Sequence, residues 1–122
     1  MKNTLFFGNV GEKAACKYLK KNKYKILACN YRKPYGEIDI IAQKAETVVF
    51  VEVKTRKGTE FGLACEAVTP SKQKRLVQTA YSFIEENHLD LNYRFDIVEV
   101  YHENGKVKTI NHIENAFLVE GF

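Results

Sequence analysis

The chain has 122 residues, which is enough for one domain with a modest core and too few for two. Hydrophobic residues make up 45% of the sequence and charged residues 28%, proportions that are ordinary for a globular protein and exclude a low-complexity chain. The formal net charge of +4 is compatible with a nucleic-acid partner but does not require one. We therefore expect a single domain over residues 1–122.

Cysteine and histidine usage argues against disulfides and zinc. Cys16, Cys29 and Cys65 are odd in number, widely spaced and set among apolar residues, which is typical of reduced thiols in a cytoplasmic protein. The three histidines are scattered near predicted turns, so we expect no zinc site. The apolar residues 5–7 are too few for a signal peptide, and no run approaches the length of a membrane span. We therefore expect a cytoplasmic protein without membrane association.

Residues 9–22 are expected to form an amphipathic helix. Apolar side chains recur at helical spacing from Val10 to Leu19, and lysines lie on the opposite side. Glu12 lies at the edge of the apolar stripe, and two roles remain open for it. It is either a glutamate that the helix dipole stabilises, or an acidic group directed along the helix flank toward a metal site.

Residues 25–31 are predicted to form a strand, and residues 32–36 a turn. Pro34 and Gly36 are typical residues that end a strand and form a turn. The turn also carries Arg32 and Lys33 beside the start of the next strand. These two cations can be solvated or can contact phosphate, and the sequence leaves both roles open.

Residues 36–56 read as a hairpin of two strands joined by a polar connection over residues 43–47. Alternation places Asp39 and Glu37 on one face of the first strand, and Glu52 and Lys54 on one face of the second. The second strand is so apolar that both of its faces should be covered. Charges within such a strand need an explanation, because an unpaired buried charge is costly.

An even-length connection, such as residues 44–47, would place Asp39 directly opposite Glu52, with Cβ atoms about 5 Å apart. Two carboxylates that close repel unless a cation lies between them, and all-oxygen sites of this kind suit Mg²⁺ (or Mn²⁺). Lys54 would then orient a metal-bound water or offset charge on a phosphoryl group. The alternative is a solvent-facing stripe in which Lys54 pairs with Glu37 or Asp39. An odd loop or a bulge would break the register.

A second helix is predicted over residues 70–87, after an irregular segment over residues 57–68. Thr69 is a suitable N-cap and Pro70 a suitable first helical residue. The helix carries an apolar stripe between Leu76 and Ile84, which predicts that this side packs on a sheet.

The first turn of this helix is expected to attract anions. Gln73 falls inside the apolar stripe, where its amide either satisfies a neighbouring backbone group or orients the attacking water or a phosphate. Lys72, Lys74 and Arg75 surround it, and free N–H groups at the helix start would add to the attraction.

Two more strands complete the expected fold. Residues 93–101 should pair parallel to the Glu52 strand, because the second helix can act as a crossover. Residues 106–113 form a further strand at an edge, and residues 116–119 are apolar enough to dock on the core. Arg94 and Asp96 are interpreted as structural. The predicted order is helix, three antiparallel strands, helix, strand, strand, which is an α/β sandwich with a mixed sheet flanked by helices.

The residues of the predicted hairpin resemble the signature of a known nuclease superfamily. Asp39 followed, after a spacer, by Glu52-Val53-Lys54 is similar to the signature of the PD-(D/E)xK nucleases, and the Gly36-Glu37-Ile38-Asp39 lead-in resembles that of Holliday-junction resolvases. A closer resemblance, over nearly the whole chain, is to the YraN-like family, which is assigned to the restriction-endonuclease-like fold. Ile38 stands where the superfamily name has proline, but the aspartate carries the ligand role.

The resemblance implies a restriction-endonuclease-like fold and a metal site. Asp39 and Glu52 would hold the metal, with the Val53 carbonyl as an added ligand as in similar sites, and Lys54 would position or polarise the water. Resolvases bring a glutamate from an N-terminal helix into the site, which favours the second role for Glu12.

Our first functional hypothesis is a Mg²⁺-dependent nuclease that hydrolyses phosphodiester bonds. The resemblance to resolvases implies branched DNA as substrate, and paired cuts would need a homodimer. The second hypothesis is a nucleic-acid-binding module with the same fold that does not cleave. A third is an acidic-patch protein that binds another partner. The predicted phosphate contacts are Arg32, Lys33, Arg56, Lys57, Lys72, Lys74 and Arg75.

Overall fold

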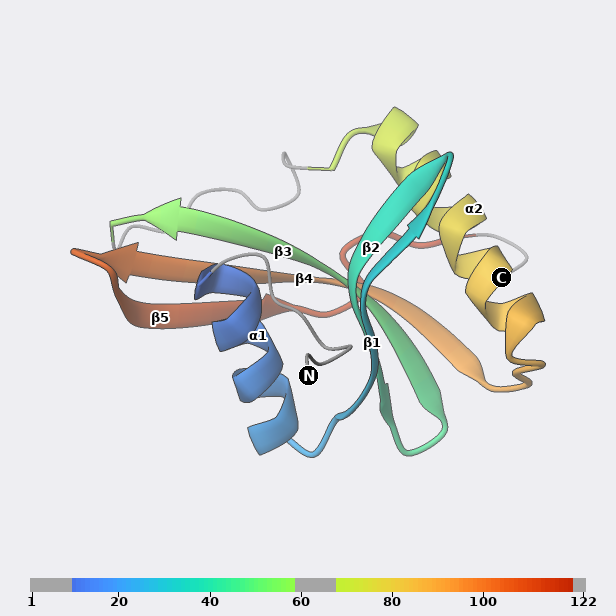
Figure 1. The fold of residues 1–122 in the computed structure, drawn as a ribbon, viewed down its shortest axis with the longest axis horizontal. Coiled ribbons are helices and arrows are strands. Elements are labelled where there is room, and N and C mark those ends of the chain that lie inside the picture. Colours follow the sequence, from blue (N-terminus) through green and yellow to red (C-terminus); the bar gives the residue numbers. More distant parts are fainter. Residues whose placement is uncertain (1–9, 59–67, 120–122) are drawn as a thin grey trace, which may run out of the picture.

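A computed structural model describes residues 10–58 and 68–119, which form one five-stranded sheet and two helices (Figure 1). The elements are α1 (Val10–Lys21), β1 (Lys25–Lys33), β2 (Gly36–Lys44), β3 (Thr47–Lys57), α2 (Pro70–Glu86), β4 (Asn92–Glu103) and β5 (Lys106–Ile113). This order confirms the predicted fold class and the predicted succession of elements. The irregular segment expected after β3 lies largely outside the described residues.

The sheet has the strand order β1-β2-β3-β4-β5. All neighbouring strands are antiparallel except β3 and β4, which are parallel. The parallel pair follows from the chain path, because the connection through α2 returns the chain to the same end of the sheet. This arrangement confirms the predicted crossover and places β5 at an edge.

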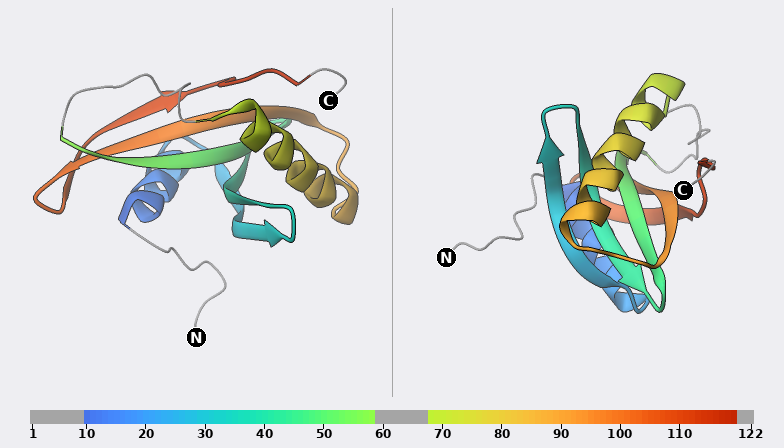
Figure 2. Two further views of the ribbon diagram at one scale, coloured as in Figure 1. Left: turned by 90° about the horizontal axis from the view of Figure 1, so that it is seen from above. Right: turned by 90° about the vertical axis from the view of Figure 1, so that its right-hand side faces the viewer.

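Two hydrophobic clusters cover the two faces of β3, because successive side chains of a strand point to opposite sides. Phe50 packs in one cluster with Leu76 of α2. Val49 and Val51 pack in the other with Leu19 of α1. In Figure 2 the two helices lie apart, each beside a different part of the sheet. The centre of β3 is therefore buried on both faces, as its apolar sequence predicts.

The sheet forks between β2 and β3. These strands pair only from Ile40 with Val51 to Lys44 with Thr47, so the first residues of β2 pair only with β1, and the last residues of β3 only with β4. In Figure 1 the β1–β2 hairpin bends away from β3. Asn30 of β1 has a φ of 52°, a left-handed conformation that asparagine tolerates better than most residues. This local kink lies in the part of the hairpin that leaves β3.

The tip of the β1–β2 hairpin docks on α2. The Lys33 ammonium pairs with the Glu86 carboxylate, and the Tyr35 hydroxyl hydrogen-bonds the Ser82 hydroxyl. Gly36 lies so close to the helix that a Cβ atom would be 2.5 Å from Thr79 Oγ1 and 3.1 Å from the Arg75 carbonyl oxygen. Glycine at this position therefore allows the start of β2 to run against α2.

Gly36→Ala is expected to lower the free energy of unfolding by about 1–3 kcal/mol, because overpacking at a close contact forces a shift of the backbone. Thr79 is fully buried and its hydroxyl donates to the Arg75 carbonyl, so it cannot turn away freely. Denaturant unfolding of the single and double variants would test this. The double variant with Thr79→Ala should lose less stability than the sum of the two single losses, and strict additivity would contradict the contact.

A buried polar network joins α1, β4 and β5. Arg94 donates to both oxygens of Asp96 at 2.9 and 2.8 Å, and His112 Nε2 lies 2.6 Å from Asp96 Oδ2. Tyr24 accepts from Arg94 at 2.7 Å, and the Tyr18 hydroxyl lies 3.0 Å from His112 Nδ1. This geometry suits an imidazole whose Nε2–H donates to Asp96. Such a network supports the structural interpretation of Arg94 and Asp96.

The two cysteines in the described part of the chain, Cys16 and Cys29, are free thiols. Burial raises the pKa of both, that of Cys29 to about 12, so neither is an activated nucleophile. Cys65 lies outside the described residues. The tail that follows β5 docks on the core as predicted, with Phe117 stacked on Phe95 at 4.9 Å between ring centroids.

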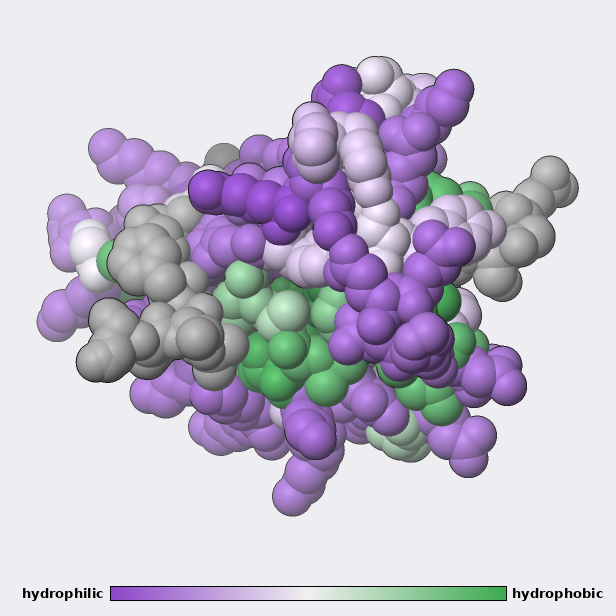
Figure 3. All heavy atoms as spheres, turned by 45° about the vertical axis from the view of Figure 1, so that its right-hand side comes forward, coloured by the Kyte–Doolittle hydropathy of each residue, from purple (hydrophilic) through white to green (hydrophobic). Residues whose placement is uncertain are grey.

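Hydrophilic residues cover most of the face shown in Figure 3, and hydrophobic atoms show mainly in one area near its centre. In residues 10–58 and 68–119, no helix combines the length and the apolar character that a membrane span requires.

Candidate metal and nucleic-acid site

Asp39 and Glu52 lie where β2 and β3 separate. Lys44 pairs with Thr47 across a two-residue turn, so the connection has the even length that the prediction required, and the next step of the register would be Asp39 with Glu52. The regular ladder ends one step earlier, at Ile40 and Val51. Beyond it, the backbone N–H of Val53 donates to Asp39 Oδ2 at 2.8 Å. The Asp39 side chain therefore takes a hydrogen bond from β3 at the point where the two backbones part.

The two carboxylates share one electrostatic environment. Burial and the negative charge of Glu52 raise the pKa of Asp39 to about 7, although the hydrogen bond from Val53 acts in the opposite direction. Glu52 is itself buried, with 8% of its surface exposed. A pair of close, buried carboxylates is costly for a protein unless cations compensate it.

Two lysines supply positive charge to Glu52. The Lys54 ammonium lies 3.5 Å from Glu52 Oε2, and the Lys72 ammonium donates a hydrogen bond to the same oxygen. Burial alone would lower the pKa of Lys72, but its hydrogen bond to Glu52 and the charge of that carboxylate raise it. Glu37 pairs instead with Arg32, at 3.2 Å. The alternative partners considered for Lys54, Glu37 and Asp39, are thus not the ones with which it forms its ion pair.

Glu12 of α1 is partly buried and acts on the same site. Its negative charge adds to the rise in the pKa of Asp39, as does that of Glu37. The start of α1 therefore brings a carboxylate within electrostatic reach of the fork, which the second of the two roles for Glu12 requires.

Gln73 lies in the first turn of α2, as predicted. Its side-chain amide donates to the Val68 carbonyl at 3.2 Å. This contact is the backbone-satisfying role that the sequence left open. The helix start also has its predicted cap, because Thr69 Oγ1 accepts from the backbone N–H of Lys72 at 3.2 Å.

The cations predicted to contact phosphate fall into two groups. Arg32, Lys33, Arg56 and Lys72 form ion pairs with Glu37, Glu86, Glu99 and Glu52, respectively. Lys57, Lys74 and Arg75 are exposed and form no ion pair with another described residue. Lys74 and Arg75 follow Lys72 closely in α2, and Lys72 is the residue of this helix that contacts Glu52.

Glu99 is a buried carboxylate that the sequence analysis missed. It lies beside Lys54 in the β3–β4 register and is fully buried. Its oxygens contact Arg56 at 3.4 Å, and both Tyr101 and Asn111 at 3.0 Å. The signal was available, because a glutamate between Val98 and Val100 interrupts an apolar strand just as Glu52 does.

The donor set at the fork fits a hard cation better than zinc. Within residues 10–58 and 68–119, no three Asp, Glu, His or Cys side chains gather to hold a metal ion. Asp39 and Glu52 could supply two carboxylates, and Val53, next to Glu52 in the sequence, could supply its backbone carbonyl. Mg²⁺ is commonly bound by one or two carboxylates while it keeps several waters, whereas structural zinc needs four protein ligands.

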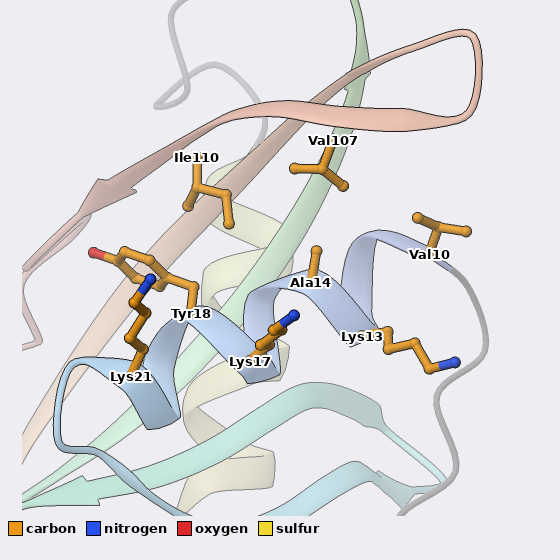
Figure 4. A pocket seen from close by; sticks show the side chains of 8 residues that line it. All are labelled: Val10, Lys13, Ala14, Lys17, Tyr18, Lys21, Val107 and Ile110. Atoms are coloured by element: carbon orange, nitrogen blue, oxygen red, sulfur yellow. The ribbon is translucent and has the colours of Figure 1, made fainter.

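A separate groove of about 460 Å³ lies between α1 and β5 (Figure 4). Apolar side chains of both elements line it, and three lysines of α1 lie along it. None of Asp39, Glu52, Lys54 and Lys72 lines this groove. The carboxylate pair and the groove are therefore different features of the surface.

The fold and the fork together define a class: an α/β protein with a mixed five-stranded sheet in which a pair of carboxylates and two lysines meet where two strands diverge. The sequence model of the family described as "Uncharacterised protein family UPF0102" matches residues 11–100. The chain belongs to this family. This result confirms the resemblance to the YraN-like family.

Curated relatives agree with this assignment. A UPF0102 protein of Caldicellulosiruptor saccharolyticus is 47% identical over 112 residues, covering 90% of this chain and 95% of the relative. One of Alkaliphilus oremlandii is 48% identical over 113 residues, covering 90% of this chain and 96% of the relative. One of Chloroherpeton thalassium is 43% identical over 122 residues, covering 98% of this chain and 95% of the relative.

Proposed function

We propose that this protein is a divalent-metal-dependent nuclease of the PD-(D/E)xK superfamily. The observation that carries the proposal is the pair of carboxylates at the fork, Asp39 and Glu52, with a raised pKa for Asp39 and two ammonium groups at Glu52 Oε2. Groups with strongly perturbed pKa values, held together by burial and charge, are typical of functional sites.

Each residue has a role in this proposal. Asp39 and Glu52 hold Mg²⁺ or Mn²⁺, with the Val53 carbonyl as a further ligand. Bound there, the metal ion would make its water a stronger acid and offset negative charge on the phosphate. Lys54 lies on the same face of β3 as Glu52 and would orient the attacking water or neutralise a phosphoryl oxygen. Glu12 would add a further carboxylate to the set, and Gln73, whose amide nitrogen donates to the Val68 carbonyl, would orient the water or a phosphate through its amide oxygen.

The substrate in this proposal is a nucleic acid, with branched DNA as the first choice because of the resemblance to resolvases. Lys57, Lys74 and Arg75 are the cations best placed for phosphate contacts, since none forms an ion pair with another described residue. Paired cuts in a junction would need two copies of the chain. The edge strand β5 is one candidate surface for such a homodimer.

A second candidate function is nucleic-acid binding without cleavage. The ion pair between Lys72 and Glu52 favours it, because an ammonium at Glu52 compensates this carboxylate without a metal. The raised pKa of Asp39 favours cleavage, because the hydrogen bond of Lys72 goes to Glu52 and not to Asp39, whose charge a metal ion would offset.

A cleavage assay would test the proposal. Labelled four-way junction, flap, duplex, single-stranded DNA and RNA would be incubated with Mg²⁺, Mn²⁺ or EDTA. We expect metal-dependent cleavage of at least one substrate, its loss in both Asp39→Asn and Glu52→Gln, and full activity in the exposed control Asp90→Asn.

Binding by the same proteins would separate the two candidates. Retained binding by Asp39→Asn without cleavage would match the nuclease. Binding without cleavage by the wild-type chain on every substrate would favour the binding module, and cleavage that survives both site substitutions would overturn the proposed site.

A further inference from the structure

Glu52 Oε2 carries two ammonium groups that come from different elements. Lys54 is two residues away on β3, with 24% of its side chain exposed, and Lys72 reaches the same oxygen from the first turn of α2. An oxygen atom that already contacts two ammonium groups leaves little space around it in which a further cation could bind. A metal ion on Glu52 must therefore compete with at least one of the two lysines.

The two lysines are not equally free to leave. Lys54 is anchored in the part of β3 that pairs with β4, beside Glu99. Lys72 has 34% of its side chain exposed and lies at a helix start, beside the exposed Lys74. Its four-carbon stem is flexible, and an ammonium binds as a point charge without a fixed geometry. Lys72 can therefore turn outward without disturbing the sheet.

We propose that Lys72 is a displaceable cation that couples metal binding to substrate binding. This inference rests on the proposed function. The Lys72 ammonium and the metal would compete for Glu52 Oε2, because this oxygen already contacts two ammonium groups and a third cation there would add repulsion. With a metal ion held by Glu52, the Lys72 ammonium would turn toward the exposed side of the α2 N-terminus, where backbone N–H groups and Lys74 favour an anion.

A testable consequence is positive cooperativity between metal binding and nucleic-acid binding. A nucleic-acid phosphate would offer the displaced ammonium a new partner, so substrate should favour the arrangement that binds metal. By thermodynamic reciprocity, metal should then favour substrate binding by the same factor. Lys72 is therefore a positioning residue in this proposal, since it acts through Glu52 and the phosphate.

Lys72→Gln tests this inference with a readout that does not depend on cleavage. The affinity for Mn²⁺, measured by titration calorimetry without nucleic acid, should rise at least about fivefold in Lys72→Gln. Lys25→Gln removes the same charge at an exposed position at the start of β1, without a contact to Glu52, so its Mn²⁺ affinity should match that of the wild type. Lys72→Ala, with its fold checked by circular dichroism, should give the same rise in affinity. This variant shows that the rise does not come from the glutamine side chain that Lys72→Gln introduces.

The outcomes separate this inference from the proposed function. Wild-type Mn²⁺ binding that Asp39→Asn abolishes but Lys72→Gln leaves unchanged or weakens would overturn the inference and leave the nuclease site intact. Binding that appears only in the two Lys72 variants would support the displacement. No binding in any variant would overturn both the inference and the proposed function.

A second measurement tests the cooperativity. With Ca²⁺ present, the wild type should bind a four-way junction more tightly than in EDTA, and this gain in affinity should be smaller in Lys72→Gln.

Discussion

Asp96→Asn is expected to lower the free energy of unfolding by about 3–5 kcal/mol at neutral pH, because it removes one partner of a buried ion pair. The Asp96 side chain has no exposed surface and accepts from Arg94, His112 and the backbone N–H of Asn115. An asparagine would present an amide group to these donors. Arg94 would then keep its charge with 18% of its side chain exposed and without a buried carboxylate.

The pH dependence of this loss has a definite sign. Burial alone would raise the pKa of Asp96, but hydrogen bonds from His112, Arg94 and Asn115 hold it below its ordinary value. An acid with a lowered pKa in the folded state stabilises the protein above its unfolded pKa and loses this contribution as the pH falls through the folded value. The difference in free energy of unfolding between wild type and Asp96→Asn should therefore have its full size above pH about 5 and become smaller below pH about 4.

Glu114→Gln is the matched control. Glu114 also faces Arg94, at 3.7 Å, but 59% of its side chain is exposed. Exposed ion pairs contribute little, so we expect a change of less than about 1 kcal/mol. Urea unfolding of the three proteins between pH 3 and 8 would measure the difference. Equal losses in the two variants would mean that the network around Asp96 does not stabilise the fold.

The β2–β3 hairpin could be predicted because its information is local. The two-residue period of a strand sets which residues of β3 share a face, and the two-residue turn between Lys44 and Thr47 sets the register. Together these features predict the register of Ile40 with Val51, and the approach of Asp39 to β3, without knowledge of the rest of the chain. The fork itself could not be predicted in this way, because it depends on the docking of Gly36 against α2 and on the backbone of Asn30.

The partners of the charged residues were less predictable. Lys72 was assigned to phosphate, and its contact with Glu52 depends on how α2 packs, 20 residues further along the chain. Arg56 likewise finds Glu99 on a neighbouring strand 43 residues away. A side chain several bonds long can reach many partners, and only the tertiary arrangement of the elements selects among them.

Asp39→Asn is expected to raise the free energy of unfolding at pH 8, in EDTA, by about 2 kcal/mol. Burial and the charge of Glu52 raise the pKa of Asp39 from its ordinary value of 3.8 to about 7, so the ionised carboxylate destabilises the fold above pH 7. The shift corresponds to about 4 kcal/mol in full, and we expect half of it because the side chain keeps some access to water. The asparagine oxygen can still accept from Val53, so the hydrogen bond at the fork is kept.

The sign of the pH dependence is opposite to that at Asp96. The folded wild type binds a proton at Asp39 more tightly than the unfolded chain does, so its stability falls as the pH rises from about 4 to about 7. Asp39→Asn lacks this loss. The advantage of the variant should therefore be largest above pH 7 and vanish near pH 4.

Chemical denaturation of wild type, Asp39→Asn and the exposed control Asp90→Asn at pH 4.5, 6 and 8 would measure this advantage. Mg²⁺ at pH 8 should then stabilise the wild type and Asp90→Asn but not Asp39→Asn, because only the first two keep the proposed metal carboxylate. A variant that is less stable than the wild type by the same amount at every pH would show that Asp39 is a structural acceptor for Val53. In that case the strain between two carboxylates, on which the metal site rests, would not exist.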